Sequence, residues 1–82
     1  AVESLEQTYL REEQKLALNR ALAQLPDDYR QVLWLSFFEG FSNKEIAAVM
    51  HKNERQVRNL LYRAKQSLKS ILEKEGFVYE DL

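Results

Sequence analysis

Residues 53–75 read NERQVRNLLYRAKQSLKSILEKE, and this stretch decides the fold that we predict for the chain. Its apolar residues recur every three or four positions, which places them on one stripe of an α-helix. They are Val57, Leu61, Ala64, Leu68 and Leu72, with Ile71 beside them. The other faces carry arginine, lysine, asparagine and glutamine side chains, which can hydrogen-bond phosphates and base edges. The stretch therefore predicts a helix that buries one stripe and turns a basic face toward a polyanion.

A strong helix start lies shortly before this stretch. Ser42 and Glu45 have the spacing of a capping box, and Phe41 can pack on Ile46 as a hydrophobic staple. The pattern predicts a short helix over about residues 43–50. Its expected buried side chains are Ile46, Ala47, Val49 and Met50.

The short helix and the long helix are separated by a tight turn. His51 belongs to the residue types that tolerate a positive φ. Asn53 can cap the long helix, and Gln56, three residues on, completes a weaker capping box. A short helix, a turn of three or four residues and a longer basic helix together predict a helix-turn-helix.

Upstream, the apolar spacing predicts two more helices. The first spans about Leu5 to Gln24 with Ser4 as its N-cap, and its polar early part resembles a linker. Its expected buried stripe consists of Leu18, Ala21, Leu22 and Leu25. Pro26 and two aspartates then favour the start of a second helix, from Asp27 to about Glu39.

The second helix is apolar on two sides. One side holds Tyr29, Val32, Leu33, Ser36 and Phe37, and the other holds Trp34, Leu35 and Phe38. Such a helix is usually central and packed between neighbours. The alternative is that Trp34, Leu35 and Phe38 form a surface that receives a partner helix.

These elements predict an all-α fold, a small four-helix domain with a C-terminal helix-turn-helix. Gly40 and Gly76 fit helix C-termini, and Phe77 can fold back on Leu72. We divide the chain into a helix start or linker remnant over residues 1–17, the domain over residues 18–76 and a short tail over residues 77–82. The chain has 82 residues and does not begin with Met, so we expect a piece of a longer protein.

The charge is distributed in blocks along the chain. Residues 1–42 carry four basic and seven acidic side chains, residues 43–70 carry seven and two, and residues 71–82 carry one and four. The overall charge of −1 is unusual for a nucleic-acid binder, but the basic block coincides with the predicted helix-turn-helix. This distribution favours a local surface that faces phosphates.

The residues indicate no enzyme, because the serines have no visible base and the lone His51 has no partner ligands. We expect no cofactor, metal or small-molecule substrate. The chain has no cysteine and no apolar run of about 20 residues, so we expect no membrane span and a cytoplasmic protein. None of the predicted helices shows the sustained heptad seam that is typical of coiled-coil oligomers.

The geometry of a helix-turn-helix on DNA assigns roles to its polar residues. Side chains in the first half of the long helix are expected to contact bases: Glu54, Arg55, Gln56, Arg58, Asn59 and Tyr62. Others lie where such domains usually meet phosphates: Ser42, Lys44, Lys52, Arg63 and Lys65. The expected partner is therefore double-stranded DNA.

The chain also resembles region 4 of bacterial sigma factors, most closely the extracytoplasmic-function (ECF) type. The resemblance covers about residues 18–72 and rests on an ordered series of motifs: LPDDYR at 25–30, FEGFS at 38–42, EIA at 45–47, QVR at 56–58 and YRAK at 62–65. It implies promoter recognition at the minus-35 element through the last helix. It also implies docking on the flap of core RNA polymerase and, in many members, inhibition by an anti-sigma factor.

Several positions depart from the pattern of that family. His51 stands where Gly is common, and Lys52 stands where an apolar residue is usual. Arg55 and Gln56 replace frequent Gly and Thr, and Leu60 replaces a basic residue. These changes leave the fold intact and the base preference open.

The sequence leaves two alternatives to promoter recognition. The first is the effector domain of a two-component response regulator, whose helix-turn-helix is similar. The second is a protein-interaction module, bound through its second helix by polymerase or an anti-sigma factor without direct DNA reading. The low net charge favours this second alternative.

Overall fold

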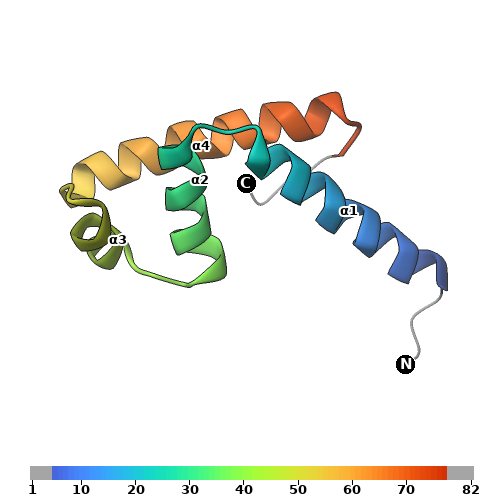
Figure 1. Cartoon of the computed structure of the whole chain (residues 1–82), viewed down its shortest axis with the longest axis horizontal. Helices are drawn as coiled ribbons and strands as arrows, with labels where there is room; N and C mark the ends of the chain where they lie inside the picture. Colours follow the sequence, from blue (N-terminus) through green and yellow to red (C-terminus); the bar gives the residue numbers. More distant parts are fainter. Residues whose placement is uncertain (1–4, 78–82) are drawn as a thin grey trace.

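The computed structural model describes the backbone of residues 5–77 and the side chains of residues 12–77. Ser4, the predicted cap of the first helix, lies outside the described residues. The described elements are α1 (Leu5–Ala23), α2 (Asp27–Leu33), a π-helix η1 (Trp34–Phe38), α3 (Asn43–Met50) and α4 (Glu54–Lys74). The predicted all-α fold with a C-terminal helix-turn-helix is confirmed (Figure 1).

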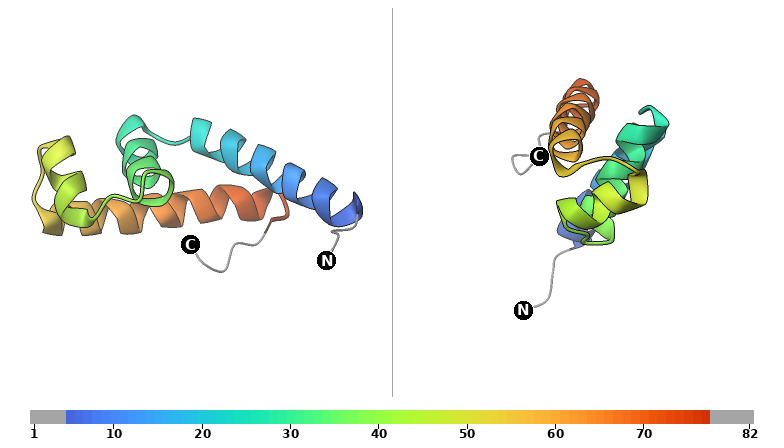
Figure 2. Two further views of the ribbon diagram at one scale, coloured as in Figure 1. Left: turned by 90° about the horizontal axis from the view of Figure 1, so that it is seen from below. Right: turned by 90° about the vertical axis from the view of Figure 1, so that its left-hand side faces the viewer.

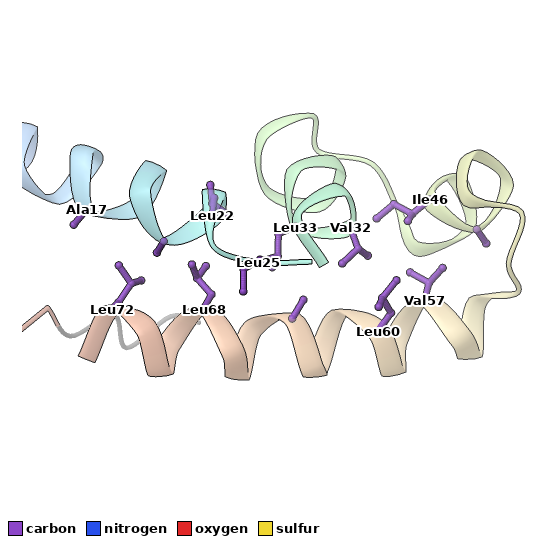
Figure 3. Close-up of a cluster of buried hydrophobic side chains, with 13 residues drawn as sticks. Ala17, Leu22, Leu25, Val32, Leu33, Ile46, Val57, Leu60, Leu68 and Leu72 are labelled. Carbon is purple, nitrogen blue, oxygen red and sulfur yellow. The ribbon is translucent and has the colours of Figure 1, made fainter. Parts of the chain in front are cut away.

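The long helix α4 is the axis of the fold, and α1, α2 and α3 lie in a row along one side of it (Figure 2). Apolar side chains fill the seam between α4 and the other three helices (Figure 3). The buried set is Ala17, Ala21, Leu22, Leu25, Val32, Leu33, Ile46, Ala47, Val57, Leu60, Ala64, Leu68 and Leu72. Because every other helix packs against the same stripe, the outer side of α4 is left uncovered.

The buried stripe of α4 differs from the predicted one at one position. Leu60 is 8% exposed and belongs to the core, whereas Leu61, which we predicted to be buried, is only partly covered. Both leucines flank the line through Val57 and Ala64. Figure 3 shows Leu60 beside Val57, facing Val32 and Ile46, because α2 and α3 cover that flank of α4.

Helix α3 buries fewer residues than predicted. Ile46 and Ala47 are buried and Met50 is partly covered, but Val49 is 45% exposed. The eight-residue helix α3 packs on its neighbours through the face that holds Ile46 and Ala47. Val49 lies outside this face and remains in contact with water. The prediction that Val49 is buried is therefore wrong.

The second predicted helix is interrupted at Trp34 by a π-turn. The Glu39 N–H donates to the Trp34 carbonyl at 3.1 Å, and the Phe41 N–H donates to the Leu35 carbonyl at 2.9 Å. In a continuous α-helix, Phe37 would lie above buried Leu33, four residues earlier. The wider turn rotates Phe37 out of the core, so this residue, predicted with the buried side, is 47% exposed.

The C-terminal end of α4 closes as predicted. Gly76 has φ +85°, which a glycine adopts without strain. The Phe77 N–H donates to the Leu72 carbonyl at 3.0 Å and the Gly76 N–H donates to the Glu73 carbonyl at 3.1 Å, the bonds of a Schellman motif. Phe77 packs against the core, so the predicted contact with Leu72 is confirmed.

Helix α1 continues without a break across the predicted boundary between residues 17 and 18. Ala17 is fully buried in the core, and Arg20 forms an ion pair with Glu75 at 3.6 Å that joins α1 to the end of α4. The division into three segments stays a prediction. None of the helices over residues 5–77 is long and apolar enough to cross a membrane.

The burial of the two leucines predicts unequal effects of truncation. Leu60→Ala removes a buried side chain and should lower the free energy of unfolding by about 2 to 5 kcal/mol. Leu61→Ala should cost clearly less, because Leu61 is already in partial contact with water. Urea unfolding followed by circular dichroism measures both values. A larger loss for Leu61→Ala would contradict this placement of the stripe.

Candidate nucleic-acid interface

The start of α3 is fixed by a reciprocal pair of hydrogen bonds. The Ser42 hydroxyl accepts from the Glu45 N–H at 3.1 Å, and the Glu45 carboxylate accepts from the Ser42 N–H at 3.0 Å. Hydrogen bonds with Ser42 hold the pKa of the Glu45 carboxylate below its ordinary value. The bond with the Ser42 backbone has the larger effect, and the bond with the Ser42 side chain has the smaller one. The predicted capping box is confirmed, and it favours the ionised form of Glu45.

The turn between α3 and α4 depends on a left-handed residue. His51 has φ 56° and ψ 46°, as its place in the sequence predicted. Past it, the Lys52 N–H donates back to the Ala47 carbonyl at 2.9 Å. This bond reverses the chain within two residues of the end of α3, so α4 begins at a defined angle to α3.

A second capping box fixes the start of α4. The Asn53 side-chain oxygen accepts from the Gln56 N–H at 2.8 Å, and the Gln56 side-chain oxygen accepts from the Asn53 N–H at 2.9 Å. The box predicted for these two residues is confirmed. Both helices of the helix-turn-helix therefore have reciprocally capped N-termini, which ties their first turns to the connecting backbone.

The outer side of α4 carries a line of polar residues opposite the buried stripe. At about 100° per residue, Arg55, Asn59 and Tyr62 lie close together on this line. All three are exposed, and Tyr62 is 66% exposed. The remaining predicted base-contacting residues are also exposed on the first two turns of α4: Glu54, Gln56 and Arg58.

The predicted phosphate-contacting residues lie at the start of α3, in the turn and on α4. Ser42 and Lys44 lie at the start of α3, Lys52 lies in the turn and Arg63 lies farther along α4, and all four are exposed. Lys65 is different, because it is partly buried and its ammonium lies 5.2 Å from the centre of the Phe37 ring. The structure thus brings Lys65 against η1.

The basic side chains around the helix-turn-helix keep their charges free of ion pairs. Within the side chains that the structure describes, the ion pairs join Lys15 to Glu12, Arg20 to Glu75 and Arg30 to Asp27. None of them uses a cation from residues 43–70. The positive potential of this segment is therefore directed at solvent, where a polyanion can use it.

A second surface, which we call the aromatic surface, consists of Trp34, Phe37 and Phe38 on η1. The rings of Trp34 and Phe38 are stacked with their centroids 4.5 Å apart, and each of these two side chains is about half exposed. The indole N–H of Trp34 donates to the Glu39 carboxylate at 3.3 Å. An open groove runs beside the Trp34 side chain. Its lining residues are Asp27, Arg30, Gln31, Trp34 and Leu35.

The structure separates the three residues that we predicted as a partner surface. Trp34 and Phe38 are exposed and stacked, whereas Leu35 is partly buried against the core and lines the groove. Sequence reasoning missed Phe37, since its spacing from Leu33 matches a buried helical position. The one available signal was crowding, because residues 34–38 (WLSFF) hold more large side chains than one buried stripe can cover.

Among the residues that the structure describes, no three histidine, aspartate or glutamate side chains gather as they would to hold a metal ion. The two surfaces instead combine exposed polar side chains, such as Arg55 and Asn59, with the exposed aromatic rings of η1. Such an arrangement suits recognition of another macromolecule.

Residues 15–68 match the family model described as "Sigma-70, region 4". The chain is 36% identical over 72 residues to the RNA polymerase sigma-H factor of Pseudomonas aeruginosa, an alignment that covers 88% of this chain and 37% of that protein. It is 33% identical over 57 residues to the ECF RNA polymerase sigma factor SigM of Bacillus subtilis, covering 70% of this chain and 35% of SigM. It thus spans little more than a third of the curated relatives it matches.

The capping box of α3 predicts a specific response to acid. The lowered pKa of Glu45 means that its ionised form stabilises the fold at neutral pH, and this contribution is lost as the pH falls below about 4.5 through the folded-state pKa. Glu45→Gln keeps an oxygen for the Ser42 N–H but does not titrate. Acidification from pH 6 to pH 3 should therefore lower the urea midpoint of the wild type more than that of Glu45→Gln. Parallel pH profiles for the two proteins would contradict the assignment.

Proposed function

The chain belongs to the sigma-70 region 4 family, and on that premise we propose that it recognises promoter DNA for an RNA polymerase sigma factor of the ECF type. The DNA element is the minus-35 element, the one that the family resemblance implies. The observation that carries the proposal is the uncovered, polar outer line of α4, held at a fixed angle by two capping boxes.

In this proposal, the first half of α4 enters the major groove. Arg55, Arg58 and Asn59 have the side-chain types that pair with guanine and adenine there. Glu54, Gln56 and Tyr62 complete the set of residues predicted at the bases. Phosphate contacts come from the exposed residues Ser42, Lys44, Lys52 and Arg63, and from the partly buried Lys65, whose ammonium lies over the Phe37 ring.

The aromatic surface would receive the flap of core RNA polymerase. Stacked, half-exposed aromatic rings beside an open groove are the kind of anchor that protein interfaces use. An anti-sigma factor that covers this surface or the outer face of α4 would silence the domain. Action on promoter DNA places the protein in the cytoplasm.

The domain itself performs no chemistry in this proposal, because the polymerase makes the RNA. The two relatives named above are both sigma factors. This favours promoter recognition over a response-regulator effector domain and over an interaction module that has lost DNA binding. Reading of the minus-10 element would belong to a part of the sigma factor outside these 82 residues.

The DNA-binding proposal predicts a steep salt dependence. Four of the five predicted phosphate contacts are cationic: Lys44, Lys52, Arg63 and Lys65. If all four form, the logarithm of the association constant should fall with the logarithm of salt concentration with a slope of about −3.6. Fluorescence anisotropy with labelled promoter duplex measures the slope. Arg63→Ala should make it less steep by about 0.9, whereas Lys15→Ala on α1, already paired with Glu12, should leave it unchanged. A wild-type chain without any slope would refute DNA binding through this face.

The partner surface can be tested separately from the fold. A fully buried Trp→Ala change would cost about 3 to 5 kcal/mol, but Trp34 is 46% exposed, so Trp34→Ala should cost less than about 3 kcal/mol. The same variant should lose most of its binding to the isolated polymerase flap in a calorimetric titration. Tyr62→Ala, which truncates an exposed ring on the DNA side, serves as the control and should keep flap binding. Wild-type flap affinity in Trp34→Ala would contradict the assignment.

A further inference from the structure

The side chain of Gln56 is already engaged before any DNA is present. Its amide lies beside the backbone N–H of Asn53, at 2.9 Å. Since that backbone group can only donate, the amide atom facing it must be the oxygen, and chemistry alone assigns the orientation of the amide. The Gln56 backbone is bound in turn by the Asn53 side chain, so the side chain lies back along the first turn of α4.

This engagement conflicts with the usual way in which glutamine reads DNA. A glutamine identifies adenine when its oxygen accepts from N6 while its nitrogen donates to N7, with the amide in the plane of the base. In this chain the capping bond takes the oxygen of Gln56 and fixes the plane of the amide to the backbone at Asn53. Both hydrogens on the amide nitrogen remain for DNA, and they suit an acceptor such as a phosphate oxygen.

The position of Gln56 on α4 agrees with a contact to the DNA backbone. Gln56 and Arg63 are seven residues apart, so they lie on nearly the same side of the helix, two turns from each other. This side is a flank between the buried stripe and the outer line. Both residues are exposed there, where they can meet one row of phosphates.

The three residues of the outer line have no such prior engagement, and two of them, Arg55 and Asn59, have side chains that can pair with a base edge. Arg55 and Asn59 are one turn apart, exposed, and without a hydrogen bond or ion pair from another described side chain. A guanidinium can make a bidentate pair with guanine, and an asparagine amide can make one with adenine. Four residues of α-helix rise about 6 Å, which matches about two base-pair steps.

We infer that Arg55 and Asn59 set the base preference, reading a guanine and an adenine about two steps apart, while Gln56 donates to a phosphate and serves all sequences alike. The inference rests on the proposed function and assigns roles within the predicted base-contacting set. It also explains how one residue can cap α4 and still contribute to DNA affinity.

The test is selection of bound duplexes from a randomised DNA pool by the full 82-residue chain and its variants. Gln56→Glu is the informative change, because its carboxylate still accepts the Asn53 N–H but has no hydrogens to donate. Gln56→Glu should select the same sequence as the wild type, with affinity for every duplex reduced roughly tenfold by the loss of a contact to a charged group. Gln56→Thr, too short for a base edge, should also keep the wild-type sequence.

Asn59→Ala and Arg55→Ala are the matched comparisons. Each should lose the preference at one position of the selected sequence, an adenine for Asn59 and a guanine for Arg55. Thermal melting checks that Gln56→Glu is folded, and its melting temperature should equal or exceed that of the wild type, because an acidic side chain in the first turn favours the helix dipole.

The outcomes separate the two levels of the proposal. A change in the sequence selected by Gln56→Glu, such as cytosine in place of adenine, would show that Gln56 reads a base and would overturn this assignment alone. Unchanged affinity in Gln56→Glu would overturn its phosphate contact. A wild-type chain that selects no sequence and shows no salt dependence would overturn the proposed function, and this inference with it.

Discussion

The fold depends on the burial of one apolar stripe along α4. Five residues of that stripe are buried, and α1, α2 and α3 each cover a different part of it (Figure 3). Among the side chains that the structure describes, the buried apolar ones form a single cluster along this seam. Because all three helices use the same side, the opposite side of the longest helix remains open to a ligand.

The helix-turn-helix adds precision to this arrangement through local hydrogen bonds. Ser42 with Glu45, and Asn53 with Gln56, form complete capping boxes on either side of the left-handed His51. The second box holds the side chain of Gln56 against the first turn of α4. The outer-line residues Arg55, Asn59 and Tyr62 carry no such capping bond.

The π-turn gives the molecule its second surface. By widening the helix after Leu33, it turns Phe37 away from the core and leaves Trp34 stacked on Phe38 at the surface. Lys65 on α4 lies over the Phe37 ring, so the aromatic surface and α4 are in direct contact. The fold therefore leaves two surfaces exposed, the aromatic surface and the outer line of α4.

The sequence alone determined the features that depend on neighbours three to six residues apart. Both capping boxes, the positive φ of His51 and the Schellman end at Gly76 follow from side-chain chemistry at fixed helical spacing, and so does the basic outer face of α4. Only the tertiary structure decided which flank of each apolar stripe is covered. The burial of Leu60 in place of Leu61 and the exposure of Val49 follow from where other helices cross. The exposure of Phe37 follows from the change to a π-helix. Periodicity specifies a face of a helix, but the neighbours that pack on it decide which of its residues lose contact with water.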